Sequence, residues 1–295
     1  MPALVSRVPK LRALADVWSH PANADRRFAA VRDSLAWQVR QRLTRGPVDL
    51  PLASGATMRG EPGMPAAHLA ASYRGLYDFE EMSFLRAYLR PGDRMLDVGA
   101  NAGVYALMAG PLVGPAGRID CFEPTPTTRR RLVTNLTLSG LSQVRVHPFA
   151  CSDAAGRVRF AATEDDHTNQ LASDRTPGTI EVEAIRLDDV VGTIDFAVGK
   201  LDIEGAEPLA LAGAREMLRR ATPPVWILEL SWRVEQFGFT TERFAAFLHD
   251  AGFDLCDFDP GDRTLRVADL SREHCNVFAV ARSRRSEVEG RLAVD

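Results

Sequence analysis

The chain has 295 residues, of which 45% are hydrophobic and 25% charged, as is ordinary for a globular protein with a sizeable core. Its 36 basic residues nearly balance its 39 acidic ones, and the formal charge of −3 gives no general attraction to nucleic acid or an anionic membrane. No apolar run approaches the roughly 18 residues that a transmembrane helix needs, and the four cysteines form no C-x-x-C pair. These features predict a cytoplasmic protein without nucleic-acid or membrane partners.

Residues 1–76 are expected to form a helical extension and linker. Apolar residues recur there at steps of three and four, as on one face of a helix: Phe28, Val31, Leu35, Val39 and Leu43. Arginines surround this stripe, which favours a solvated face; the alternative is a contact in a homo-oligomer or part of a lid. Residues 46–65 are rich in proline and glycine and predict a loop or linker.

Residues 77–282 alternate between strand-like and helix-like segments, which predicts a doubly wound α/β domain. Helices are expected at 80–89, 128–138 and 241–250, and the helix that starts at 104 should kink or stop near Pro111. Strands are expected at 95–98, 118–123, 144–150, 194–201 and 225–230, with a closing pair at 253–258 and 276–281. Alternating segments at 158–160 and 180–185 predict an insertion near the ligand face. Residues 283–295 predict a charged, frayed tail.

One stretch joins the first strand to its helix: Asp97-Val98-Gly99-Ala100-Asn101-Ala102-Gly103. Its spacing is G-x-x-x-G rather than the G-x-G-x-x-G of pyrophosphate-binding turns. Glycines at 99 and 103 would let the backbone approach a ligand closely. The carboxylate of Asp97 would repel a phosphate and attract an ammonium or sulfonium group.

Two further acidic positions follow strands of the same predicted sheet. Glu123 lies 20 residues after Gly103, where an acid in a doubly wound fold binds the ribose hydroxyls of an adenosine ligand. Ser152-Asp153 follows the third strand, and Asp153 could accept a hydrogen bond from an adenine amino group. A turn stabilised by the Asp153 side chain is nearly as probable an interpretation on the residues alone.

A third acidic block, Asp202-Ile203-Glu204-Gly205-Ala206-Glu207, follows the strand that contains Lys200. Asp202 and Glu204 come at the carboxyl end of that strand, and Gly205 permits a sharp exit. Glu207 falls in the first turn of the next helix, where the helix dipole stabilises an acid by roughly 0.3–1 kcal/mol. A structural role is therefore the favoured interpretation of Glu207.

These three blocks, with Cys121-Phe122-Glu123-Pro124 as the second, resemble the signature blocks of the FkbM-type methyltransferases over residues 77–232. The resemblance implies a class I methyltransferase with a seven-stranded, mostly parallel sheet and S-adenosylmethionine as cofactor. It implies that cofactor contacts come from these residues and their direct neighbours: Asp97, Gly99, Asn101, Gly103, Tyr105, Glu123, Pro124, Ser152 and Asp153. It also implies O-methylation of a polyketide or sugar hydroxyl, with the third block beside the transferred methyl group.

Methylation of an alcohol requires a base within hydrogen-bond reach of the hydroxyl. Asp202 is the first choice, with Glu204, Glu229 and His167 as further candidates. The acids Asp202, Glu204 and Glu229 could instead hold Mg²⁺, which prefers oxygen ligands, although their spacing is not diagnostic.

Two other classes of protein share some of these features. A nicotinamide-dependent oxidoreductase has the same strand, turn, helix and ribose acid, but the missing G-x-G-x-x-G counts against it. A non-catalytic protein could bind the cofactor and regulate a partner, although the intact acids of the third block argue against that interpretation.

Overall fold

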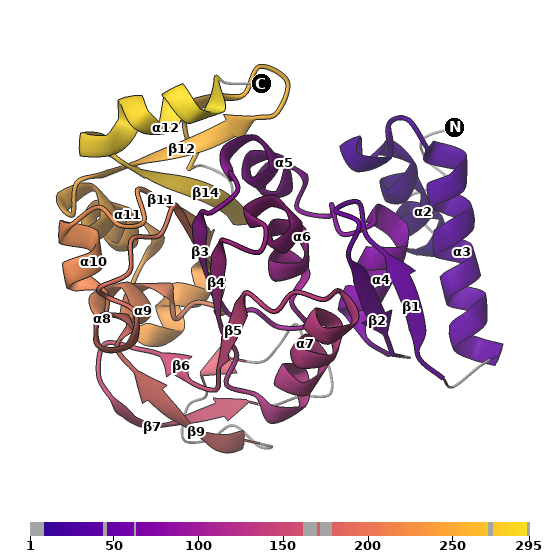
Figure 1. Cartoon of the computed structure of the whole chain (residues 1–295), viewed down its shortest axis with the longest axis horizontal. Helices are drawn as coiled ribbons and strands as arrows, with labels where there is room; N and C mark the ends of the chain where they lie inside the picture. Colours follow the sequence, from indigo (N-terminus) through magenta and orange to yellow (C-terminus); the bar gives the residue numbers. More distant parts are fainter. Residues whose placement is uncertain are drawn as a thin grey trace.

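The computed structural model describes residues 9–43, 46–61, 63–161, 170–171, 179–270 and 274–293. Within these residues the central element is an eight-stranded sheet with the strand order β13-β12-β14-β11-β10-β3-β4-β5 (Figure 1). Its strands are β3 (Arg94–Val98), β4 (Arg118–Phe122), β5 (Val144–His147), β10 (Val198–Leu201), β11 (Val225–Ser231), β12 (Phe253–Asp259), β13 (Thr264–Val267) and β14 (His274–Ala281).

The sheet is parallel from β5 to β11 and antiparallel beyond it. β14 pairs antiparallel with both β11 and β12, and β13 pairs antiparallel with β12. The doubly wound α/β class expected from the sequence is confirmed. The expected number of seven strands differs from the eight described here, because Thr264–Val267 folds back on β12 and adds an edge strand.

Helices cover both faces of this sheet (Figure 1). One face packs on α5 (Phe79–Tyr88), α6 (Val104–Val113), α7 (Pro126–Leu138) and α12 (Arg285–Leu292). The other face packs on α8 (Leu187–Val190), α9 (Glu207–Ala212), α10 (Arg215–Arg219) and α11 (Thr241–Asp250). Because both faces are covered, β10 and the part of β3 after its exposed first residue, Arg94, are buried, and Asp97 and Lys200 are the charged residues within them.

The helix α6 continues past Pro111 and ends at Val113, two residues later than the proline that was expected to stop or kink it. Pro111 has no N–H group to donate to the carbonyl of Leu107, one turn earlier. The hydroxyl of Ser54 donates to that carbonyl at 2.9 Å instead. A residue from the N-terminal region thus replaces the hydrogen bond that the proline removes.

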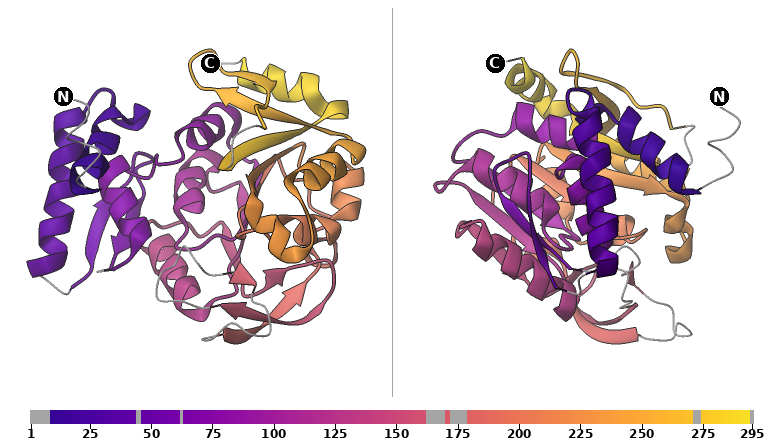
Figure 2. Two further views of the ribbon diagram at one scale, coloured as in Figure 1. Left: turned by 180° about the vertical axis from the view of Figure 1, so that it is seen from behind. Right: turned by 90° about the vertical axis from the view of Figure 1, so that its right-hand side faces the viewer.

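The N-terminal region consists of α2 (Pro9–Ser19), η1 (Pro21–Asn23), α3 (Arg27–Leu43), the hairpin β1 (Val48–Pro51) and β2 (Thr57–Gly60), and α4 (Pro65–Tyr73). The loop expected at 46–65 is therefore partly a β-hairpin. The backbone of β2 is joined to α7, since Thr57 N–H donates to Ser139 Oγ and Arg59 N–H donates to Asn135 Oδ1. In the second view of Figure 2, α3 lies in front of the rest of the chain. The domain division at residue 76 remains a prediction.

A second, smaller sheet follows β5. It contains β6 (Ala150–Cys151), β7 (Gly156–Ala161), β8 (Gln170–Leu171) and β9 (Thr179–Ile185) in the order β6-β9-β7-β8. The two alternating segments expected as strands do pair, as β7 and β9, in antiparallel register. The strand expected at 144–150 is wrong in its extent, because the main-sheet strand ends at His147 and Ala150–Cys151 pairs with β9 in the second sheet.

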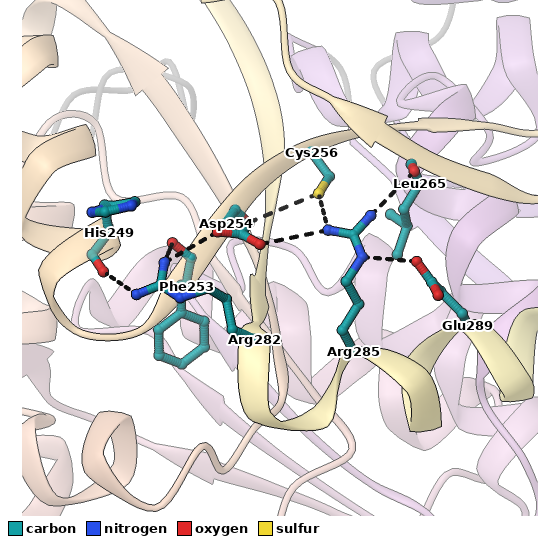
Figure 3. A network of polar contacts seen from close by, with 8 residues as sticks. All are labelled: His249, Phe253, Asp254, Cys256, Leu265, Arg282, Arg285 and Glu289. Atoms are coloured by element: carbon teal, nitrogen blue, oxygen red, sulfur yellow. Dashed lines mark hydrogen bonds and ion pairs between the residues drawn. The ribbon is translucent and has the colours of Figure 1, made fainter.

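The frayed tail expected at 283–295 is also wrong, because residues 285–292 form α12. Val288 and Leu292 are buried against the sheet and α5. Figure 3 shows the polar contacts at the start of this helix, where Arg285 and Arg282 each make an ion pair with Asp254 of β12. Burial of these two apolar residues, four positions apart on one face, stabilises the charged segment as a helix.

In the ranges that the structure describes, no helix is both long enough and apolar enough to cross a membrane. Cys121, Cys151 and Cys256 are buried free thiols, as expected for small apolar side chains.

Candidate active site

A cavity of about 300 Å³ lies at the carboxyl ends of β3, β4, β10 and β11. Between β3 and β10 the strand order changes direction, and open α/β sheets bind their ligands in the crevice at such a point. The cavity volume is at the lower end of the range for small-molecule sites. The N-terminal region closes one side of it through Ala66 of α4, and the segment before α5 contributes Tyr77 and Asp78.

The turn between β3 and α6 borders the cavity, and its glycines lie tightly against protein atoms. Gly99 has φ +79°, and a Cβ there would lie 2.0 Å from the carbonyl oxygen of Asp202. Gly103 has φ +90°, and a Cβ there would lie 2.4 Å from Leu132 of α7. Gly99 lets the loop after β3 approach the loop after β10 and also lines the cavity, so its close approach to a ligand remains a prediction. Gly103 does not line the cavity and lets α6 approach α7.

Glu123 lines the cavity at the end of β4 and fixes the glycine turn. Its Oε2 accepts a hydrogen bond from the backbone N–H of Asn101 at 3.1 Å, and its Oε1 accepts one from Thr125 N–H at 2.8 Å. Burial raises the pKa of Glu123 to about 7, although both N–H donors act in the opposite direction. A carboxylate offers about four lone-pair positions, so two remain for the hydroxyls of a ligand.

A buried lysine is central to the charges of the site. Lys200 on β10 lies beside Asp97 on β3 in the parallel register, its Nζ is 3.1 Å from Asp202 Oδ2, and it lies 4.4 Å from the centre of the Tyr105 ring. Burial alone would lower the pKa of Lys200, but the charges of Asp202 and Asp97 outweigh burial and raise it. Lys200 is therefore a permanent ammonium group at the base of the cavity.

The partners of Lys200 form one network with the segment before α5. Tyr105 donates its hydroxyl proton to Asp78 Oδ2 at 2.8 Å. Asp78 occupies the N-cap position of α5 without capping it, although an aspartate there usually binds the first free N–H groups of the helix. Burial raises the pKa of Asp78 to about 6. Its carboxyl group thus pairs with Tyr105 inside the site and does not cap the helix.

The acids of the third block have separate roles. Glu204 has φ +60° and forms an ion pair with Arg233. Glu207 begins α9, and its Oε1 accepts hydrogen bonds from the N–H groups of Ile203 and Gly205. Burial raises the pKa of Glu204 to about 7 and that of Glu207 to about 8. Glu207 thus stabilises the turn between β10 and α9, in agreement with the structural role favoured by the sequence analysis.

The predicted site residues fall into three groups. Eight line the cavity: Gly99, Asn101, Tyr105, Glu123, Pro124, Asp202, Glu204 and Glu229. Four do not line it: Asp97, Gly103, Ser152 and Asp153. His167 lies outside the described residues.

The four residues that do not line the cavity have physical reasons for their positions. Asp97 is fully buried beside Lys200, and Cys121 Sγ lies 3.9 Å from its Oδ2. Ser152 follows β6, a strand of the second sheet, and therefore does not lie at the carboxyl edge of the main sheet. Its hydroxyl donates a hydrogen bond to the carboxylate of Asp153, which is exposed. Phe149, Ala150 and Cys151 of the same segment line the cavity instead.

Several lining residues were missed by the sequence analysis, above all Asp78, Tyr77 and Asn276. Asp78 could have been noticed as an acid directly before a predicted helix, but that position predicts a cap and not a site residue. Asn276 lies on β14, opposite Glu229 of β11, and only the antiparallel pairing brings it to the cavity.

The fold and the cavity at its switch point define a doubly wound α/β protein of the class I methyltransferase type, with a site rich in acids. The model of the family described as "Methyltransferase FkbM domain" matches residues 97–255, which is more than half of the chain. The chain belongs to this family, so it is a methyltransferase of FkbM type, as the sequence blocks predicted.

Individual relatives are more distant. The chain is 29% identical, over 200 residues, to 31-O-demethyl-FK506 methyltransferase FkbM of Streptomyces tacrolimicus, covering 54% of this chain and 76% of that protein. Fibrillarin of Aeropyrum pernix with bound S-adenosyl-L-methionine is similar with a TM-score of 0.39 and 15% identity, covering 80% of this chain and 94% of that one. A SAM-dependent methyltransferase of Aquifex aeolicus gives a TM-score of 0.39 and 18% identity, covering 73% and 92%.

Proposed function

We propose that this methyltransferase uses S-adenosylmethionine to methylate a hydroxyl oxygen of a small molecule of polyketide or sugar type. The observation on which the proposal depends is the cavity at the switch point, which brings Glu123, Asp202 and Glu204 together. The name of the relative from Streptomyces tacrolimicus describes an oxygen as the methylated atom, and this supports an oxygen acceptor here.

The chain's own residues fit the donor. Glu123 has free acceptor positions toward the cavity for ribose hydroxyls, and Pro124, Gly99 and Asn101 border the same space. S-adenosylmethionine supplies, when bound, a methyl group activated by a sulfonium charge. The acids that line the cavity favour a cation over the phosphates of a dinucleotide, since opposite charges attract most strongly where water is excluded.

Asp202 is the residue that we assign to proton removal. Its side chain is 43% exposed, whereas Lys200 behind it is nearly buried, so the carboxylate faces the cavity while the ammonium holds one of its oxygens. As the acceptor oxygen forms its new bond to the methyl carbon, the bond from that carbon to the donor sulfur breaks and leaves neutral S-adenosylhomocysteine, and Asp202 takes the hydroxyl proton. Orientation of the acceptor by the surrounding walls supplies the remainder of the rate enhancement.

Calorimetry with S-adenosylmethionine and, separately, NADH tests the donor assignment. We expect binding of the first and none of the second, and the reverse result would overturn the donor assignment and favour the nicotinamide-dependent alternative. The reaction is then tested by mass spectrometry of hydroxylated acceptors incubated with the enzyme and trideuteromethyl-labelled donor. Tight donor binding without turnover on any acceptor would favour the non-catalytic alternative.

A further inference from the structure

We propose that Asp202, Glu207 and Glu229 form a binding site for one divalent metal cation at the inner end of the cavity. One carboxylate oxygen of each of these residues lies within 4.8 Å of the others. They come from three different segments, the end of β10, the start of α9 and the middle of β11. Oxygen atoms at this separation can converge on a single ion.

The second observation concerns Glu207, which is fully buried. Its Oε1 is bound by the N–H groups of Ile203 and Gly205, but its Oε2 has no hydrogen-bond partner. Buried polar atoms in folded proteins almost always have a partner, so an unsatisfied carboxylate oxygen requires an explanation. A cation shared with Asp202 and Glu229 provides that partner.

The charge of the cluster matches a divalent ion. With all three groups ionised, as binding of a cation requires, the carboxylates bear −3, and the ammonium of Lys200, bound to Asp202 Oδ2, reduces this to −2. Glu204, which the sequence analysis grouped with Asp202 and Glu229, is already neutralised by Arg233. Glu207 thus takes the place that the sequence suggested for Glu204.

The chemistry of the donor set restricts the ion. All three ligands are carboxylate oxygens, which are the ligands that Mg²⁺, Ca²⁺ and Mn²⁺ prefer. Asp202 and Glu229 line the cavity, so an ion there is accessible from it, and coordination positions on that side remain for water or a ligand oxygen. If the proposed function holds, an acceptor hydroxyl in such a position would have its pKa lowered by the ion.

Binding of Mn²⁺ alone tests the site, measured by the loss of the free-ion signal in electron paramagnetic resonance with the full chain and no donor or acceptor. We expect one ion per chain, displaced by excess Mg²⁺. Glu207→Gln and Glu229→Gln should each weaken Mn²⁺ binding about tenfold or more. Glutamine at 207 retains an Oε1 acceptor for Ile203 and Gly205, so this variant should fold, which circular dichroism checks.

Glu216→Gln is the matched control, because Glu216 is exposed on α10 and pairs with Arg219. Its Mn²⁺ affinity should equal that of the parent. The proposal is overturned if the parent retains no Mn²⁺ at millimolar concentration, or if Glu207→Gln binds as tightly as the control. The Mn²⁺ assay contains neither donor nor acceptor, so either of these results leaves the methyl-transfer proposal standing. Conversely, a parent chain that binds Mn²⁺ but transfers no methyl group in the mass-spectrometry assay would contradict the methyl-transfer proposal alone.

Discussion

The carboxylate of Glu123 already accepts two backbone N–H groups, and what it offers a ligand is the remaining half of its acceptor capacity. Glu123→Ala should weaken S-adenosylmethionine binding about 10- to 100-fold, because hydrogen bonds to a charged group contribute roughly 1.5–3 kcal/mol. Calorimetry measures the affinity. Asp153→Ala is the matched control: Asp153 was expected near the adenine, but it is exposed and outside the cavity lining. Equal losses in both variants would contradict the placement seen here.

Asp202 provides a second prediction at the scale of single residues. Asp202→Asn should lower kcat about 10²- to 10⁴-fold, since the amide cannot accept the hydroxyl proton. The affinity for S-adenosylmethionine should change little. An acceptor with a more acidic hydroxyl, such as a phenol, should lose less activity than an aliphatic alcohol. A parental rate on the aliphatic acceptor would remove Asp202 from the role of base.

Glu81 on α5 makes the stability of the folded protein depend on pH. Burial raises its pKa from 4.5 to about 7, although a hydrogen bond with Asn276 opposes the shift. Between these pH values the folded protein retains a proton that the unfolded chain releases. The stability contributed by neutral Glu81 is therefore complete below pH 4.5 and is lost as the pH rises through about 7.

Glu81→Gln should accordingly gain stability relative to the parent as the pH rises, with a slope approaching about 1.4 kcal/mol per pH unit in that window. Urea unfolding at several pH values measures the difference. Glu80→Gln, at an exposed position on the same helix, is the control and should follow the parent. Parallel curves for all three proteins would show that Glu81 is charged in the folded state.

At the scale of elements, α6 depends on the N-terminal region because of its internal proline. Ser54→Ala should lower the free energy of unfolding by about 1 kcal/mol, since the Leu107 carbonyl loses its donor. In a Pro111→Ala background the backbone N–H restored at position 111 can satisfy that carbonyl, so the same change should cost less. A double-mutant cycle by denaturant unfolding measures this coupling. Independent effects of the two substitutions would contradict it.

The stripe on α3 is another feature of an element. Phe28 and Leu43 are 83% and 78% exposed, whereas Trp37 on the opposite face is buried. The helix thus packs through a face that the sequence periodicity did not single out, and the predicted stripe faces outward. A homo-oligomer through this region remains a prediction.

At the scale of the whole molecule, the site is assembled from distant parts of the chain. The N-terminal region contributes Ala66, the main sheet contributes its acids and Lys200, and β14 contributes Asn276. Hydrogen bonds hold the N-terminal region against the helices of the main sheet. They join β2 to the C-terminal end of α7, and Ser54 to α6. Methyl transfer therefore depends on a cavity whose walls are separated by some two hundred positions in the sequence.

The amino-acid sequence alone determined the class of fold, the methyltransferase family and the segments that end at the cavity. These properties are local, since a buried strand followed by a glycine turn and a helix is recognisable from adjacent residues. Tertiary structure alone decided that Asp153 lies outside the cavity, that Glu207 and not Glu204 joins Asp202 and Glu229, and that Lys200 neutralises part of their charge. The physical reason is that strand register, ion pairing and burial depend on neighbours brought together only by folding.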